Sequence, residues 1–319
     1  MILSLHQLGI ELSSNSEIVC QQWQQLFQGW LKPTASPVDV RLHLSLEAQF
    51  PPLPEASPYF SDAQHLPDGV GILSVYRDGE TGVWLHYLDG ALVRVPLHSA
   101  AAAAIEGRMV AKVLDYGRFE DVTFTSLAPV LRRRGYFLVH AFAARKNGRC
   151  ALIIGTTNSG KTTTGLNLLL NGWQLMANDI VLLQQRERVV YALPTPGIVN
   201  IRPRTLDLLP GLRPLLSDKH PVYGQYNIIG EELVNGRWGE PCPVTHIYFP
   251  YIEQREQSTL HHRNRAVALA HLMAESMDRW DEETLQDHIN LLQRLVRQVQ
   301  AYEIHLGQDM PQIPPLFSQ

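Results

Sequence analysis

The sequence predicts an α/β fold that follows an α+β region, and two observations support this prediction. After about residue 125, short apolar runs alternate with segments of helical spacing, as in chains whose strands and helices follow one another. Before that point, alternating strand patterns are separated by Asp-Gly turns. The chain has 319 residues, 45% of them hydrophobic and 18% charged, so it can form two domains, each with an apolar core.

Residues 1–125 are predicted to form the α+β region. We expect helices at 17–31 and 100–114, and strands at 38–46, 71–77, 83–88 and 91–95, with hairpin turns at 78–79 and 89–90. The stretch 50–68 is rich in Pro and Ser and is expected to be a loop. No chemical motif occurs in this region, so its sequence indicates no function.

Residues 126–310 are predicted to form the α/β domain, and the Pro-rich tail 311–319 is expected to be frayed. Strand patterns occur at 136–143, 150–154, 173–183, 189–193, 246–252, 258–262 and 301–306. Helical patterns occur near 130–134 and at 162–171, 266–275 and 284–297. We expect the strands 246–252 and 258–262 to pair directly as a hairpin.

One motif in this domain indicates a chemistry. Residues 155–162 match the P-loop pattern of a glycine, four residues, and Gly-Lys-Ser/Thr. Its glycines permit a tight turn whose N–H groups converge on an anion. Lys161 can reach the β- and γ-phosphates, and Thr162 can ligate Mg²⁺. The residues expected to hold a nucleoside phosphate such as ATP are Gly155, Thr156, Thr157, Asn158, Ser159, Gly160, Lys161, Thr162 and Thr163.

The segments on either side agree with this interpretation. An apolar run at 151–154 predicts a buried strand before the motif, and a helix at 162–171 would direct its N-terminus at the anion. Gly172 lies where a glycine commonly ends a helix. The alternative is an ordinary turn rich in Gly, Ser and Thr.

Phosphotransfer also needs a carboxylate for Mg²⁺ and a group near the nucleophile. Asp179 follows an apolar run and is the expected metal ligand, the alternative being an Asp in a turn. Asn178 can orient a hydroxyl or a water, but an amide cannot accept a proton. His140, at the centre of a predicted strand, is either a proton acceptor or a core histidine with satisfied hydrogen bonds.

The sequence allows two interpretations for each of two groups of arginines. Arg263 and Arg265 precede a predicted helix, where they either reach a transferring phosphate or solvate a turn. The run of arginines at 132–134 is interpreted as a solvated helix end rather than a phosphate clamp.

Composition and charge exclude several classes of partner. The net charge of −4 provides no electrostatic footprint for nucleic acid. The three cysteines are far apart and lack metal-ligand spacing, so neither a disulfide framework nor a zinc site is indicated. No run approaches about 18 apolar residues, and the first residues lack a signal-peptide pattern. We therefore expect no membrane partner and a cytoplasmic location.

Taken in order, these motifs resemble the HPr kinase/phosphorylase family. The resemblance rests on the histidine-bearing strand 137–141, the P-loop, and the segments 171–173 and 177–181, and residues 301–304 look like the closing strand of the family's relatives. It extends over about 130–306 and is strong from 137 to 181. It implies a phosphoenolpyruvate carboxykinase-like P-loop kinase domain that phosphorylates a serine-type hydroxyl with Mg·ATP. Lys161 would then contact the phosphates, with Thr162 and Asp179 on the metal.

The sequence departs from that family's pattern in three places. Asn178 stands where the family has an aspartate thought to deprotonate the acceptor serine. Residues 197–200 (Gly-Ile-Val-Asn) keep a family stretch loosely, but 193–196 (Leu-Pro-Thr-Pro) precede it without the family's glutamate. Residues 1–125 do not resemble the N-terminal domain of the bacterial HPr enzymes. The chain is more similar to the divergent HPr kinase-related branch, whose members often accompany peptide-modification systems, and HPr is not the expected substrate.

The leading expectation is ATP-dependent phosphotransfer to a serine or threonine hydroxyl on a peptide or small protein, such as a precursor peptide. Lys161 would position the phosphoryl group, and Asp179 or His140 would take the proton. Two alternatives remain open. One is a nucleotide-binding regulatory or substrate-presenting subunit without turnover, which Asn178 favours; the other is a kinase for a small molecule such as free serine. A homo-oligomer is compatible with all three.

Overall fold

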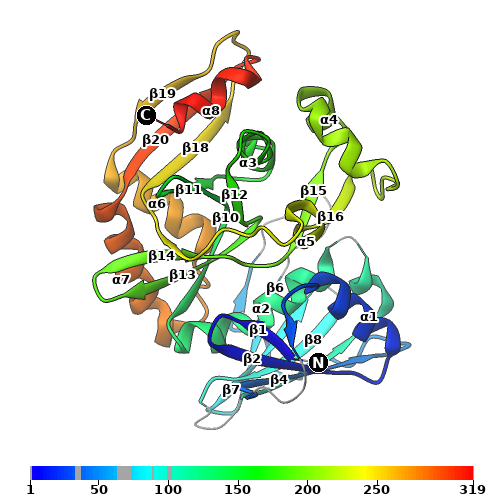
Figure 1. Cartoon of the computed structure of the whole chain (residues 1–319). Helices are drawn as coiled ribbons and strands as arrows, with labels where there is room; N and C mark the ends of the chain where they lie inside the picture. Colours follow the sequence, from blue (N-terminus) through cyan, green and yellow to red (C-terminus); the bar gives the residue numbers. More distant parts are fainter. Residues whose placement is uncertain are drawn as a thin grey trace. The chain divides into compact units, whose positions relative to one another are not determined.

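The computed structural model describes residues 2–32, 37–62, 73–87, 90–98, 103–115 and 117–318. The chain divides into two compact units (Figure 1). The first contains Met1–Arg134 with Trp280–Glu282, and the second contains Gly135–Arg279 with Glu283–Gln319. The division falls after residue 134 rather than near residue 125, because helix α2 (Arg118–Arg133) belongs wholly to the first unit.

Among the described residues, the first unit is built on a nine-stranded sheet in the order β3-β1-β2-β4-β9-β8-β7-β6-β5. The strands are β1 (Ile2–Leu5), β2 (Leu8–Ser13), β3 (Leu31–Lys32), β4 (Val40–Leu46), β5 (Phe60–Ser61), β6 (Leu73–Asp78), β7 (Gly82–Tyr87), β8 (Ala91–Pro96) and β9 (Ala103–Met109). β4 is parallel to β2 and β9, and the other pairs are antiparallel. Helix α1 (Glu17–Leu26) buries Val19, Trp23 and Leu26, as its spacing predicts.

The expected helix at 100–114 is wrong. Residues 103–109 form β9 between β4 and β8, and Ala111–Leu114 form the short 3-10 helix η1. The alanines of this segment favour a helix, but buried Ala103, Ile105 and Met109 alternate with exposed residues, which suits a half-buried strand. Pairing with β4 along the whole of β9 then decides the structure. Residues 99–102 lie outside the described part of the chain.

The hairpin turn at 78–79 is confirmed, because β6 and β7 pair antiparallel from Asp78 and Gly82 onward. The second turn, at 89–90, includes residue 89, which lies outside the described residues. The expected loop at 50–68 contains the two-residue strand β5, and its residues 63–68 also lie outside the described part.

The arginines at the end of α2 are not a solvated helix end. Arg132 is 4% exposed, and its Nη2 lies 2.6 Å from Oδ2 of Asp281, while Nη2 of Arg133 lies 3.0 Å from Oδ1. Burial raises the pKa of Asp281, but the hydrogen bonds and charges of both arginines outweigh this effect and lower it. A buried carboxylate needs such partners, so these ion pairs hold the segment Trp280–Glu282 in the first unit.

The second unit contains a mixed sheet in the order β17-β14-β13-β10-β11-β18-β20-β19, with β12 also paired to β10. Its strands are β10 (Tyr136–Lys146), β11 (Arg149–Ile154), β12 (Gln174–Ala177), β13 (Ile180–Arg186), β14 (Val189–Leu193), β17 (Cys242–Pro243), β18 (His246–Ile252), β19 (Thr259–His262) and β20 (Gln300–Leu306). β11, β18 and β20 run parallel. Helices α6 (Arg265–Ser276) and α7 (Glu282–Gln298) pack into one apolar cluster of this sheet, and α3 (Lys161–Leu170) and α8 (Ile313–Leu316) into the other (Figure 1).

The register of β10 brings two turns together beside the middle of this strand. Ala141 pairs with Ile154, the last residue of β11, and His140 pairs with Ile180, the first residue of β13. The N–H of Ala141 also donates to the carbonyl of Asp179 at 3.1 Å. The end of β11, the turn before β13 and the side chain of His140 therefore lie together.

Two further expectations about the second unit are wrong. The strands 246–252 and 258–262 do not form a hairpin, because β20 lies between β18 and β19 and pairs with both. The tail is not frayed, since it forms the 3-10 helix η3 (Met310–Gln312) and then α8. Phe317 is fully buried, and its ring centroid lies 4.0 Å from that of Tyr248, so apolar contacts hold the tail on the sheet.

A small subdomain was not predicted from the sequence. Strands β15 (Ile198–Ile201) and β16 (Tyr226–Ile229) form a two-stranded antiparallel sheet with α4 (Pro203–Leu208), the 3-10 helix η2 (Pro210–Leu216) and α5 (Gly230–Val234). Its apolar residues form a cluster that includes Leu166 of α3. This contact places β15 and α4 beside the helix that follows the P-loop motif.

Helix α3 ends as its sequence predicts. Gly172 has φ +80°, its N–H donates to the carbonyl of Leu169 at 3.0 Å, and the N–H of Trp173 donates to Leu168 at 3.1 Å. This pair of hydrogen bonds is a Schellman motif, which satisfies the last carbonyls of the helix. Among the described residues, no helix has both the length and the apolar composition of a membrane span.

Packing of α3 on the sheet leads to a stability prediction. A Cβ added to Gly165 would lie 2.4 Å from ring carbons of Phe142 on β10. Gly165→Ala should therefore lower the free energy of unfolding by about 1–3 kcal/mol, although alanine is the better helix former. Urea denaturation measures this change. Leu170→Ala, at a residue 45% exposed on the same helix, is the control and should cost less. An unchanged midpoint for Gly165→Ala would contradict this packing.

Candidate functional site

The P-loop motif forms a turn between a strand and a helix, as expected. Residues 155–160 connect β11 to α3, and Lys161, Thr162 and Thr163 form the first turn of that helix. Gly160 precedes the helix with φ +100°, and a Cβ there would lie 2.9 Å from Cδ1 of Leu306. Glycine is therefore required by both backbone and neighbour. The first N–H groups of α3 have no partner within the helix, which favours an anion at this end.

Lys161 lies back over its own loop. Lys161 is 7% exposed, and its Nζ donates hydrogen bonds to the carbonyl of Gly155 and, at 3.1 Å, to the carbonyl of Thr156. Burial lowers the pKa of Lys161, and the nearby charges of Asp179 and Glu275 oppose that change. The ammonium group is thus held at the loop by neutral carbonyls, close to two carboxylates.

Asp179 and Asn178 form the turn between β12 and β13. Asp179 has φ +61°, a conformation that aspartate tolerates better than most residues. Its side chain is 42% exposed. Asn178 is 4% exposed, and its Nδ2 donates to the carbonyl of Ile198 at 2.9 Å and to Oδ2 of Asp179 at 3.1 Å. Asn178 is therefore a buried donor that fixes the Asp179 carboxylate and β15, rather than a group presented to an acceptor.

His140 lies between two carboxylates. Its Nε2 is 3.7 Å from Oδ1 of Asp179, and its Nδ1 is 3.2 Å from Oε2 of Glu275. Burial lowers the pKa of His140, but the neighbouring carboxylates of Asp179 and Glu275 outweigh burial and raise it. The hydrogen bond to His140 in turn lowers the pKa of Glu275. His140 is thus neither an isolated core residue nor a fully exposed base.

Glu275 was not predicted from the sequence. It lies near the end of α6, far along the chain from the P-loop, and only the packing of α6 beside β10 brings it to His140. A carboxylate in the last turn of a helix, where the dipole disfavours it, is the one local signal that pointed to a special environment.

The segment after β15 forms a third side of the site and was also missed. Nη1 of Arg202 donates a hydrogen bond to Oδ1 of Asn158 in the P-loop. The hydroxyl oxygen of Thr205 lies 2.9 Å from that of Thr163 on α3. The sequence signal for this segment was the loosely kept stretch 197–200, which leads directly to Arg202.

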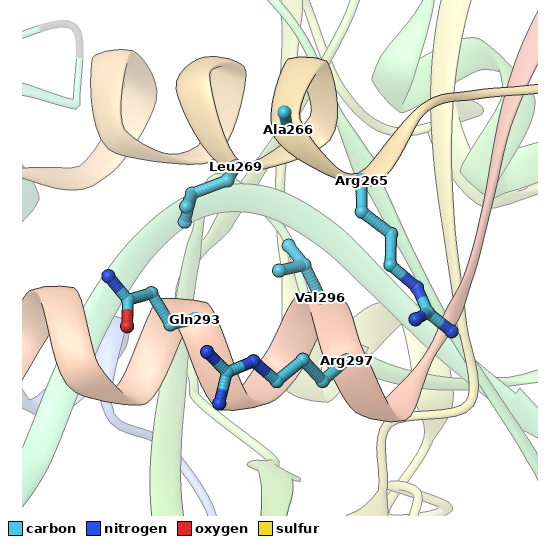
Figure 2. A pocket seen from close by; sticks show the side chains of 6 residues that line it. All are labelled: Arg265, Ala266, Leu269, Gln293, Val296 and Arg297. Carbon is cyan, nitrogen blue, oxygen red and sulfur yellow. The ribbon is translucent and has the colours of Figure 1, made fainter.

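The structure gives different environments to the two arginines near 263–265. The side chain of Arg263 is 4% exposed, and its guanidinium lies 3.2 Å from Oε1 of Glu303 and 4.3 Å from the ring centroid of Phe249. Arg263 therefore stabilises the sheet end and does not extend to a phosphate. Arg265 lines a shallow, open pocket of about 370 Å³ between α6 and α7, together with Arg297 (Figure 2).

The donors at the loop fit a magnesium–phosphate group. Among the described residues, no cluster of three or more His, Cys, Asp or Glu side chains could hold a metal by itself. Mg²⁺ bound with a nucleotide needs only one or two protein oxygens, since phosphates and water complete its shell. The hydroxyl of Thr162 and the part-exposed carboxylate of Asp179 are oxygen ligands of this kind. Two buried oxygens, Oγ of Ser159 and Oδ1 of Asn178, lack a hydrogen-bond partner among the described residues.

Comparisons with known proteins identify no family for this chain. No protein-family model matches it, and no curated protein matches its sequence. Among solved structures, it is similar to the Hpr(Ser) kinase/phosphatase from Coxiella burnetii, with 12% identity and a TM-score of 0.27, over 56% of this chain and 89% of that chain. At this level of similarity, the function has to be inferred from the residues of the site.

The pairing of His140 with Glu275 predicts a pH dependence. Glu275→Gln removes a carboxylate and should lower the pKa of His140, measured by NMR titration of the imidazole. Because the folded-state pKa of His140 is raised, the pair stabilises the fold below the ordinary histidine pKa of about 6.5, and this stabilisation is lost as the pH rises through the folded-state pKa. Glu275 must also be ionised, so the contribution also fades as the pH falls through the lowered pKa of that carboxyl.

Glu275→Gln should therefore cost stability chiefly in mildly acidic solution and little at alkaline pH. Asp287→Asn, at an exposed residue on α7, is the control and should leave the titration of His140 unchanged. A His140 titration that is the same in Glu275→Gln and wild type would contradict the pairing.

Proposed function

We propose that this chain is an ATP-dependent phosphotransferase that phosphorylates a serine or threonine hydroxyl on a peptide or small protein, with a precursor peptide as the favoured substrate class. The proposal places the reaction in the cytoplasm, where ATP is available. The observation that carries it is the position of two turns beside neighbouring residues of β10: the glycine-rich turn before α3, onto which Lys161 folds, and the turn that holds Asp179. A cation, a carboxylate and unpaired helix N–H groups at one point are the parts that phosphoryl transfer requires.

Each residue has a role in the proposed reaction. The N–H groups of the loop and the first turn of α3 would bind the phosphate oxygens, and Lys161 would exchange its carbonyl partners for the β- and γ-phosphates. Thr162 and Asp179 would hold Mg²⁺, which neutralises phosphate charge when bound. Catalysis then consists mainly of positioning and charge stabilisation, because the transition state of phosphoryl transfer is loose.

The same geometry favours one of the two candidate proton acceptors, Asp179 and His140. The raised pKa of His140 keeps its imidazole protonated over a wider pH range, and a protonated imidazole cannot accept the proton of the hydroxyl. Asp179 presents a part-exposed carboxylate whose other oxygen is fixed by Asn178. We therefore assign the acceptor hydroxyl's proton to Asp179, with His140 and Glu275 orienting the carboxylate.

A second candidate function is a nucleotide-binding subunit without turnover. It is favoured by Asn178, which stands where a base would be expected from the sequence resemblance. In the structure, however, both hydrogen bonds of this amide are donated to oxygen atoms, which supports a positioning role. The amide therefore stabilises the carboxylate that the first proposal uses.

Nucleotide binding is tested at Lys161. Lys161→Ala should weaken the binding of Mg·ATP by about 100-fold or more, since it removes a charge-assisted contact to phosphate in a buried site. Isothermal titration calorimetry measures the dissociation constant. Lys219→Ala, which removes a lysine paired with Glu232 in the same unit, is the control and should bind like wild type. Equal affinities for Lys161→Ala and wild type would refute the phosphate site.

Turnover is tested at Asp179 and Asn178 in single-turnover assays with labelled ATP and peptides encoded beside this chain's gene. Asp179→Asn should reduce the rate by a factor on the order of 10²–10⁴. Asn178→Asp should also lower the rate and the melting temperature, because a carboxylate would face Asp179 and the carbonyl of Ile198 in place of a donor. A wild type that binds nucleotide but is inert, with activity appearing in Asn178→Asp, would support the subunit without turnover.

A further inference from the structure

We infer that Arg202 is a second cationic ligand for the nucleotide's phosphates, held by Asn158 until the nucleotide binds. This inference rests on the proposed nucleotide site and adds a residue to it from outside the P-loop. Arg202 directly follows β15 and precedes α4, with an extended backbone (φ −81°, ψ 152°). It is exposed, and its Nη1 donates to Oδ1 of Asn158, an exposed residue of the loop with φ +69°.

The backbone beside Arg202 is fixed to the site on both sides. Before it, the carbonyl of Ile198 accepts a hydrogen bond of 2.9 Å from Asn178. After it, Thr205 lies 2.9 Å from Thr163 of α3 through their hydroxyl oxygens. The side chains of β15 and α4 share an apolar cluster with Leu166 of the same helix. Arg202 therefore extends from a rigid segment that is attached both to the Asp179 turn and to the P-loop helix.

The charges around the loop indicate that the guanidinium of Arg202 supplies a positive charge for an anionic ligand. The positive charge of Lys161 is offset by the nearby carboxylates of Asp179 and Glu275, so these three residues supply no net positive charge. Arg202 differs, because its hydrogen-bond partner among the described residues is the neutral amide of Asn158. It therefore adds a positive charge at the rim of the loop, where a polyphosphate of several negative charges would lie.

For Arg202, the exchange of the Asn158 amide for a phosphate group is favourable because of the strength of the hydrogen bonds involved. A guanidinium has five N–H donors in a planar fork, and its described contact uses one of them. Charge-assisted hydrogen bonds to phosphate are about twice as strong as bonds to a neutral acceptor, and arginine can make two of them in parallel. A bound phosphate should therefore displace the amide oxygen of Asn158.

The competing explanation is that Arg202 only tethers the P-loop in its conformation. The two explanations differ in what Asn158 does. As a tether, Asn158 is as necessary as Arg202, and removing either weakens binding. As a resting partner, Asn158 competes with the nucleotide for the guanidinium, so removing it leaves binding equal or tighter.

Calorimetry with two probes, Mg·ATP and inorganic tripolyphosphate, tests this inference on the full chain. Arg202→Ala should weaken both probes by a similar factor of about 10-fold or more, and it should reduce the salt dependence of binding. Arg202→Lys should show a smaller loss, because it keeps the charge but not the fork. Asn158→Gly removes the side-chain amide but keeps the backbone N–H and tolerates the φ of +69°, so this variant should bind both probes at least as tightly as wild type. Melting temperatures verify that each variant is folded. If Arg202→Ala does not fold, the affinities of Arg202→Lys and Asn158→Gly test the inference.

Three results would overturn the inference while leaving the proposed function intact. They are wild-type affinity in Arg202→Ala, equal losses in Arg202→Ala and Asn158→Gly, and a loss of affinity for ATP without a loss for tripolyphosphate. A wild type that binds neither probe would instead refute the proposed function itself, and the role of Arg202 with it.

Discussion

The register of β10 is the constraint on which the candidate site depends. Ala141 pairs with the residue before the P-loop, and His140 pairs with the residue after Asp179. Because side chains alternate between the faces of a sheet, a shift of one residue would turn His140 to the opposite face and separate it from Asp179. Buried apolar residues of β10 contribute to the clusters on both sides of the sheet, which makes such a shift unfavourable. The arrangement of the polar site is thus maintained by apolar packing.

Within that arrangement, the site satisfies its own charges before any ligand is present. Carbonyl oxygens hold Lys161, two carboxylates flank His140, and the buried amide of Asn178 fixes Asp179. Buried charges are costly unless paired, so these contacts allow a polar site to persist in a folded chain. In the proposed function, a phosphate group would replace the carbonyl partners of Lys161 with stronger, charge-assisted contacts, so a site for a charged ligand would be compatible with a stable fold.

Several elements were predicted from sequence because local patterns determined them. The strand–turn–helix around residues 155–162 and the glycine end of α3 depend on backbone conformations that few residues adopt, and both are confirmed. The predictions for other segments were wrong where long-range contacts determined the secondary structure. The alanine-rich run near residue 103 pairs with β4 instead of forming a helix, and β20 separates two strands that are near in sequence. The tail is ordered because Phe317 packs on Tyr248, which no local pattern reveals.

The sequence by itself determined the P-loop motif and the nearby His140, Asn178 and Asp179, because these residues lie within one stretch whose spacing reflects a strand, a turn and a helix. Only the tertiary structure added Glu275 and Arg202, which come from α6 and from the segment after β15. It also decided that Asn178 is a buried donor rather than a group facing an acceptor. The reason is physical: backbone turns follow from neighbouring residues, whereas ion pairs and hydrogen bonds between distant segments follow from how sheets and helices pack.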